Sequence, residues 1–198
     1  FYLLNDQEYA VITRENITFY DEQLHPFEKK YQRIDWDATA AEKNGYPDFM
    51  LKEMYEQPST VRETIGTRVT AGAPTQVDGL DFTAAQLQNL HQIYIIGCGT
   101  AMHAGLAAKP MFEHLTHIPT QVDVASEFRY RDPLVDDRTL CIFISQSGET
   151  ADTIAALRLA KAAGAATLAV SNVIGSSITR EADYTVYTHA GPEIAVAS

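Results

Sequence analysis

The sequence predicts an α/β fold: a flavodoxin-like, doubly wound, five-stranded parallel sheet preceded by a short N-terminal β segment and a linker. Three observations support this. From about residue 80, strand-like and helix-like segments alternate. The runs 92–96 and 140–144 are apolar on both strand faces, as expected of strands covered by helices on both sides. Each of these runs is followed by a polar loop that opens a helix-like segment.

The N-terminal residues read as two short strands, 9–13 and 16–20, joined by a tight turn. Residues 21–47 are polar and show neither a helical nor a strand period, so they are predicted to be a linker. From Asp48, a candidate N-cap, a helical pattern runs to Pro58 and then restarts over 61–69. We expect that helix to pack on the domain that follows.

The alternating part begins with a short helix. The expected helices are 83–90, 101–115 and 150–163, and the expected strands are 92–96, 120–125, 139–144, 166–171 and 183–188. The predicted domains are therefore an N-terminal remnant at 1–20, a linker at 21–47 and the main domain at 48–198.

Net charge, the lengths of apolar runs and cysteine spacing argue against several classes of function. The formal net charge of −11 argues against a nucleic-acid partner, which needs basic patches. No apolar run approaches the roughly 20 residues that span a bilayer, so we expect a cytoplasmic protein with no membrane partner. Cys98 and Cys141 fall on or beside predicted buried strands without a CxxC spacing, so we expect reduced thiols.

The two polar loops carry the main functional signal. They are Gly97-Cys98-Gly99-Thr100-Ala101 and Ser145-Gln146-Ser147-Gly148-Glu149-Thr150. In the strand order 2-1-3-4-5, these loops leave the first and third strands, which are neighbours at the topological switch point. Sheets of this type bind ligands there. Both loops are therefore predicted to line one crevice.

The chemistry of the loops suits a phosphate monoester. Ser145, Ser147 and Thr150 supply hydroxyls, and the helix that begins near Thr150 offers unpaired N–H groups and the positive end of its dipole. Gln146 and Thr100 suit a sugar hydroxyl or the phosphate. Serine, glycine and threonine after a strand are also ordinary turn and N-cap residues, and that alternative stays open for either loop alone.

Three more specific functional motifs can be compared with the sequence, and the sequence matches each of them poorly. The first loop begins like a dinucleotide fingerprint, but Met102 stands where a third small residue is needed, so a nucleotide-dependent enzyme is disfavoured. The second loop lacks the glycine that a nucleophile elbow carries two residues before its serine. His114 and His117 lack further ligands, so they are interpreted as helix-terminus residues, His103 as a packing residue, and no metal is expected.

Charged residues flank the crevice. Arg129 and Arg131 could clamp a phosphate, but ion pairs at a surface are the favoured interpretation. Glu149 and Asp152 lie in the first turn of the helix after the second loop, where the dipole favours carboxylates. Since they would repel a phosphate, we expect both to point away from it.

Several ordered blocks resemble the glucosamine-6-phosphate synthase family, the isomerising glutamine:fructose-6-phosphate aminotransferases. The blocks are Gly97–Thr100, Ala125–Arg131, Ser145–Thr153, Glu193–Ser198 and, upstream, Met50–Pro58. Residues 1 to about 20 resemble the last strands of the family's glutaminase domain. The similarity covers nearly the whole chain.

This resemblance implies a first sugar isomerase (SIS) domain that binds fructose 6-phosphate. Substrate-binding positions implied by the matching motifs are Thr100, Ala101, Ser145, Gln146, Ser147, Thr150, Val196 and Ser198. Family members often carry serine where this chain has Ala101, so here only a backbone N–H could contribute.

The resemblance also implies what the chain lacks. The family's catalytic lysine, glutamate and histidine lie in parts that this sequence does not match, so we expect no catalytic residue, no cofactor and no turnover by the chain alone. Expected partners are fructose 6-phosphate, glucosamine 6-phosphate, the missing glutaminase and second SIS domains, and a second copy in a homodimer. The alternative is a noncatalytic sugar-phosphate sensor, which would carry a helix-turn-helix in place of the N-terminal strands.

Overall fold

A computed structural model of the chain describes residues 2–31, 42–66, 68–69, 72, 77 and 79–195. The chain divides into two compact units, residues 1–38 and 39–198, which we describe separately. Among the described residues, none of the helices has the length and apolar character needed to cross a membrane.

The N-terminal unit is a small antiparallel sheet. Strand β1 (Tyr9–Ile12) pairs with β2 (Ile17–Tyr20), and the predicted hairpin is confirmed. The sequence did not predict β3 (Pro26–Phe27), which pairs with β2 inside the segment interpreted as a linker. Two residues are too few to show a strand period, and proline is tolerated there because β3 is an edge strand.

The second unit contains the predicted parallel sheet. Its strands are β4 (Gln92–Gly97), β5 (Thr120–Val124), β6 (Thr139–Ser145), β7 (Ala166–Ser171) and β8 (Tyr184–Tyr187). The spatial order is β5-β4-β6-β7-β8, and every neighbouring pair is parallel. This is the predicted order 2-1-3-4-5, and the flavodoxin-like fold is confirmed.

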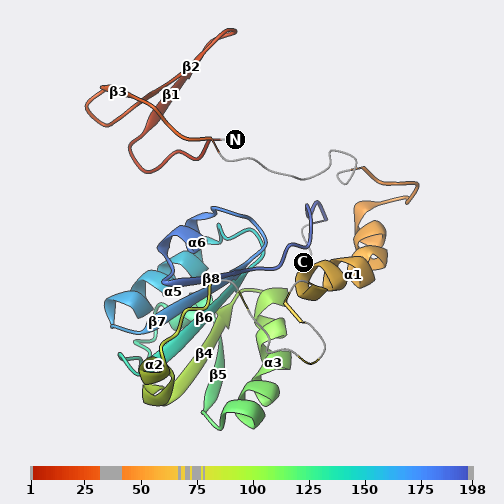
Figure 1. Cartoon of the computed structure of the whole chain (residues 1–198), viewed down its shortest axis with the longest axis vertical. Coiled ribbons are helices and arrows are strands. Elements are labelled where there is room, and N and C mark those ends of the chain that lie inside the picture. Colours follow the sequence, from red (N-terminus) through yellow and green to blue (C-terminus); the bar gives the residue numbers. More distant parts are fainter. Residues whose placement is uncertain are drawn as a thin grey trace. The chain divides into compact units, whose positions relative to one another are not determined.

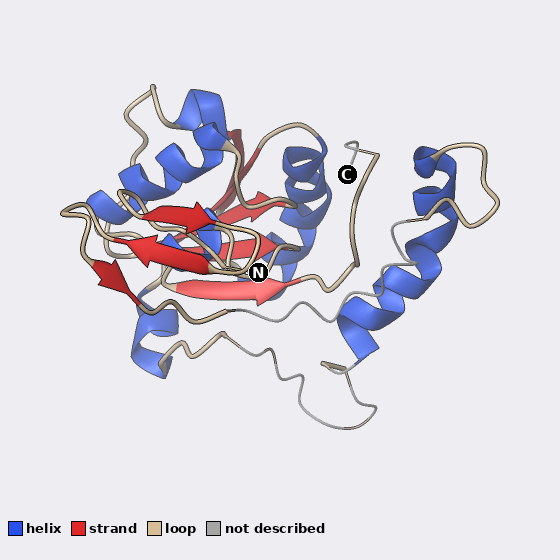
Figure 2. Cartoon of the chain, turned by 90° about the horizontal axis from the view of Figure 1, so that it is seen from above, coloured by secondary structure: helices blue, strands red, loops and turns tan. Residues whose placement is uncertain are grey.

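Helices cover both faces of this sheet, as Figures 1 and 2 show. Helix α3 (Thr100–Thr116) lies on one face, and α5 (Ala151–Ala162) with α6 (Ser177–Glu181) lies on the other. The short helix α2 (Ala84–Asn89) begins at Thr83, whose side chain forms a capping box with Gln86.

The core consequently has two halves that follow the alternation of each strand. On the α3 side, the buried residues are Ile93, Ile95, Leu140, Ile142 and Leu168. On the α5 side, the buried strand residues Tyr94, Ile96, Cys141, Phe143 and Ala169 pack with Phe128, Ala156, Leu157, Ala160 and Ile178 from the helices. Strands apolar on both faces are therefore buried on both faces, as the sequence predicts.

Helix α1 (Phe49–Gly66) differs from the expectation. Its N-terminus is capped as predicted, since the Asp48 side chain accepts a hydrogen bond from the Leu51 N–H at 2.8 Å. The expected break at Pro58 and the extension to residue 69 are both wrong, because one helix runs through Pro58 and ends at Gly66. Hydroxyls just after the proline donate to carbonyl oxygens of the preceding turn, Ser59 to Glu56 at 2.7 Å and Thr60 to Gln57 at 3.1 Å. Proline removes only the N–H that would bond to the Met54 carbonyl one turn earlier, and the helix continues without that bond.

Two short helices escaped prediction. They are α4 (Ala125–Phe128) and α6, of four and five residues. A single turn is too short to display a helical period, so the sequence gives no signal for it. The other helix and strand boundaries of the sheet domain agree with the expected ones to within one residue.

Candidate sugar-phosphate site

The two polar loops lie next to each other at the carboxyl edge of the sheet. Their strands, β4 and β6, are direct neighbours, with Gly97 paired to Ile144. A Cβ atom at Gly97 would lie 3.0 Å from the Met102 nitrogen and 3.1 Å from the Ile144 carbonyl oxygen. The first loop can therefore turn this tightly against its neighbour only with glycine at Gly97.

The loop after β6 is held by its own hydroxyls. Ser145 is buried, its Oγ accepts a hydrogen bond from the Gly148 N–H at 3.1 Å, and the same Oγ lies 3.3 Å from Thr150 Oγ1. Ser147 Oγ accepts from the Glu149 N–H at 3.2 Å. A hydroxyl oxygen that accepts can still donate its own proton, so the turn role of these side chains is compatible with binding an anion.

Gly148 fixes the shape of this loop. Its φ is +67°, a conformation that favours glycine. A Cβ at this position would come within 2.0 Å of Ser176 Oγ and 2.5 Å of Ser176 Cβ. The loop is thus packed directly against the segment that opens α6, and the Ile178 N–H donates to the Gly148 carbonyl at 3.0 Å.

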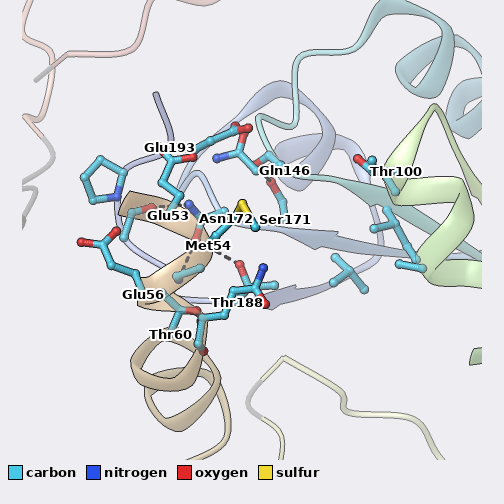
Figure 3. Close-up of a pocket in the computed structure, with 18 of the residues that line it drawn as sticks. Glu53, Met54, Glu56, Thr60, Thr100, Gln146, Ser171, Asn172, Thr188 and Glu193 are labelled. Carbon is cyan, nitrogen blue, oxygen red and sulfur yellow. Dashed lines mark hydrogen bonds between the residues drawn. The ribbon is translucent and has the colours of Figure 1, made fainter. Parts of the chain in front are cut away.

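A cavity of about 410 Å³ opens beside these loops. Three of the predicted residues line it: Thr100, Ala101 and Gln146. The remaining wall comes from α1, from Ala104 of α3, from the ends of β6 and β7, and from the chain after β8. Figure 3 labels Thr100 and Gln146 together with residues of α1, of the end of β7 and of the chain after β8. The loops and α1 therefore face the same space.

The cavity differs in charge between its ends. Its α1 wall and the chain after β8 contribute Glu53, Glu56 and Glu193, whereas the loop end contributes neutral Thr100 and Gln146. No lysine or arginine lies among the described lining residues. In the described part of the chain, Glu193 Oε1 is buried without a hydrogen-bond partner.

Asn172, which sequence reasoning missed, connects the loop after β6 to the chain after β8. It is 5% exposed, and its backbone N–H donates to the Gln146 carbonyl at 3.0 Å. Its side-chain Nδ2 donates to the Gly191 carbonyl at 2.6 Å, and its Oδ1 accepts from Thr188 Oγ1 at 3.0 Å and the Ala190 N–H at 2.8 Å. This asparagine therefore fixes the chain after β8 beside the cavity.

A sequence signal for this residue did exist. Ser171 and Asn172 follow the predicted strand 166–171 directly, and polar residues in that position lie at the ligand-binding edge of a parallel sheet. Of the other predicted residues, Ser145, Ser147 and Thr150 build the adjoining loop without lining the cavity, and Val196 and Ser198 lie outside the described residues.

The interpretation of the flanking arginines as ion-pairing residues is confirmed. Arg129 pairs with Asp152 at 2.8 Å, and Arg131 pairs with Asp123 at 2.5 Å. Glu149 accepts a hydrogen bond from the Ser177 N–H at 2.7 Å. Of the two carboxylates expected in the first turn of this helix, only Asp152 lies there, and Glu149 lies in the loop before α5. Both are engaged elsewhere, as expected.

The positions of the two cysteines and of His114 and His117 favour structural roles for these residues. Cys98 and Cys141 are free thiols, and burial raises the pKa of Cys141 to about 12. His114 lies in the last turn of α3, and His117 caps that helix in the left-handed conformation. Within the described ranges, no group of three or more His, Cys, Asp or Glu residues is placed to hold a metal ion.

The fold and the cavity define a doubly wound α/β domain whose candidate ligand site lies at the switch point of its sheet. The sequence profile described as SIS domain matches residues 86–198. The chain belongs to the SIS domain family.

Individual relatives agree with this assignment. The chain is 53% identical over 197 residues to a glutamine–fructose-6-phosphate aminotransferase (isomerizing) of Clostridium acetobutylicum, and 51% identical to that of Clostridium perfringens. Each alignment covers 100% of this chain and 32% of the relative, so the chain spans about a third of the length of these proteins. The resemblance deduced from the sequence blocks is thereby confirmed.

A solved structure supports the same family assignment. The C-terminal domain of a glucosamine-fructose-6-phosphate aminotransferase from Francisella tularensis superposes with a TM-score of 0.71 at 43% identity. The match covers 80% of this chain and 44% of that one.

Proposed function

We propose that this domain binds fructose 6-phosphate as the sugar-binding half of an isomerising aminotransferase that makes glucosamine 6-phosphate from fructose 6-phosphate and glutamine. The observation that carries the proposal is the pair of hydroxyl-bearing loops on adjacent strands β4 and β6. They border one cavity in a chain whose curated relatives are named as such aminotransferases.

The phosphate is proposed to bind at the loop end. Its ligands would be the hydroxyls of Ser145, Ser147 and Thr150, with Gln146, Thr100 and the backbone N–H of Ala101 beside them. Support comes from α5, which begins at Ala151 and whose first N–H groups have no acceptor within the helix. Neutral donors and a helix N-terminus can hold a phosphate without a lysine or arginine.

The charge of the cavity sets the orientation of the ligand. A phosphate would be repelled by the carboxylates Glu53, Glu56 and Glu193 at the α1 end. The sugar therefore points toward α1 and the chain after β8, which leads to Val196 and Ser198, the residues proposed to border the sugar.

The domain is proposed to bind without catalysing. Proton transfer between sugar carbons needs a base within hydrogen-bond reach of the substrate, and the two loops supply none, because their one carboxylate, Glu149, is bonded to the Ser177 N–H. The three glutamates at the α1 end are not proposed as the base, which the family resemblance assigns to another domain. The base and the ammonia would come from other domains of a cytoplasmic parent enzyme, and we propose that this parent is a homodimer.

The alternative, a noncatalytic sugar-phosphate sensor, receives less support. A sensor of that kind is expected to carry a helix-turn-helix, whereas the described residues of the N-terminal unit form an antiparallel sheet.

Calorimetric titration of the 198-residue chain tests the proposal. Fructose 6-phosphate and glucosamine 6-phosphate should bind, and NAD should not. Ser147→Ala and Thr150→Val should each weaken sugar-phosphate binding about tenfold, the effect of removing one hydrogen bond to a charged group. Ala101→Ser, which adds a hydroxyl at the cavity wall, should strengthen it.

The matched control is Thr116→Val. Thr116 ends α3, at the opposite edge of the sheet from the loops, and its substitution should leave binding unchanged. Binding of NAD in preference to the sugar phosphates, or equal loss in the Thr116 and Thr150 variants, would contradict the proposal.

A further inference from the structure

The chain after β8 forms a wall of the cavity and is held almost entirely through its backbone. We call residues Thr188–Ala195 the C-terminal strap. Asn172 holds its first part through Thr188, Ala190 and Gly191. Helix α1 also holds the start of the strap, because the Thr64 hydroxyl donates to the Thr188 carbonyl. Just before it, Arg68 donates to the Tyr187 carbonyl at 2.6 Å.

The far end of the strap depends on one side chain of α1. Glu53 Oε1 accepts hydrogen bonds from the Ile194 N–H at 2.8 Å and the Ala195 N–H at 3.2 Å. Glu53 is half-buried and lines the cavity. Hydrogen bonds from backbone N–H groups to a carboxylate are among the stronger ones in proteins.

Neighbouring carboxylates are placed differently. Glu56, one turn further along α1, lies 3.4 Å from the Lys52 ammonium. Glu193, on the strap itself, has an oxygen buried without a hydrogen-bond partner among the described residues. Of the three carboxylates that line the cavity, Glu53 is therefore the one that joins α1 to the strap.

We propose that Glu53 is a positioning residue for the sugar: by holding Ile194 and Ala195, it fixes the end of the strap and with it the strap residues 190–193 that line the cavity. This inference rests on the proposed function, which places the sugar at this end of the cavity. Glu53 acts through the strap and not on the phosphate, whose proposed ligands lie on the loops after β4 and β6. Its removal should consequently affect a ligand that has a sugar and spare one that is phosphate alone.

The experiment compares Glu53→Ala and Glu53→Gln with the wild-type chain, using fructose 6-phosphate and inorganic phosphate as probes in calorimetry. Glu53→Ala should weaken fructose 6-phosphate binding about tenfold and change inorganic phosphate binding by less than about twofold. Glu53→Gln keeps an acceptor oxygen at the same place, so it should recover most of the lost affinity.

Glu63→Ala is the matched control, because Glu63 is an exposed carboxylate on the same helix and does not line the cavity. Hydrogen exchange supplies a readout without ligand: the amides of Ile194 and Ala195 should exchange faster in Glu53→Ala than in Glu53→Gln or Glu63→Ala.

The outcomes separate this inference from the proposed function. If the wild-type chain binds fructose 6-phosphate and Glu53→Ala binds it equally well, the positioning role is refuted and the proposed function stands. Equal loss of both probes in Glu53→Ala, or no rescue by glutamine, also refutes it. Failure of the wild-type chain to bind fructose 6-phosphate would remove both claims.

Discussion

Replacing Gly148 by alanine should destabilise the sheet domain more than the same change at another glycine of equally unusual conformation. The strain of a positive φ costs alanine about 1–2 kcal/mol. At Gly148 the added Cβ would also press on Ser176 and, at 3.0 Å, on Ile178 Cγ2. Overpacking of this kind costs about 1–3 kcal/mol. The free energy of unfolding should therefore fall by about 2–5 kcal/mol in total.

Gly164 provides the matched comparison. It joins α5 to β7 with a φ of +90°, and a Cβ there would meet only Asp137 atoms at 3.8 Å or more. Gly164→Ala should consequently cost the conformational strain alone, about 1–2 kcal/mol. The difference between the two variants isolates the packing of the loop after β6 against the start of α6.

Urea unfolding followed by far-ultraviolet circular dichroism measures both variants. Equal destabilisation of Gly148→Ala and Gly164→Ala would refute the packing argument. A further check is the double variant Gly148→Ala/Ser176→Gly, which removes the atoms at 2.0 and 2.5 Å and should recover part of the loss.

Three other predictions concern single side chains. Cys141, whose pKa burial raises to about 12, should resist alkylation in the native chain at neutral pH, while half-buried Cys98 should react first. Burial opposes ionisation of Asp183, but hydrogen bonds from Lys161 and a threonine outweigh it and lower the pKa of Asp183. Its stabilising effect should thus be present above about pH 4 and disappear as the pH falls through the lowered pKa, so acid titration of stability should separate Asp183→Asn from wild type only above that range. Arg129→Ala, which breaks a partly exposed ion pair, should cost less than about 1 kcal/mol in urea unfolding and leave sugar-phosphate binding unchanged in calorimetry.

The sequence predicts the sheet domain well because the patterns that indicate its strands and loops lie within short stretches of sequence. Strands 92–96 and 139–144 are apolar on both faces, and each is followed at once by glycine and hydroxyl residues, so strand order and loop positions follow from topology rules. The continuous helix through Pro58 could not be predicted in this way. Residues on both sides of Pro58 bond to the chain after β8, Glu53 to Ile194 and Thr64 to Thr188, and no local pattern reports contacts between residues so far apart in the sequence.

Most of the cavity wall escaped prediction for the same reason. Glu53 meets Ile194 across 141 positions of the sequence, and no local pattern reports such a contact. Asn172 had a local signal, its place after a strand, but the bonds that make it important reach residues after the next strand.

The attachment of α1 to the strap has a consequence for how these proteins can diverge. Glu53 and Thr64 both bond to amide or carbonyl groups of the strap, which every amino acid except proline can present in full. Positions 194 and 195 can therefore exchange one side chain for another without losing their attachment to α1, provided that proline is avoided at both. Among natural variants, side-chain identity should therefore vary more at positions 194 and 195 of the strap than at Glu53 of α1, which holds them.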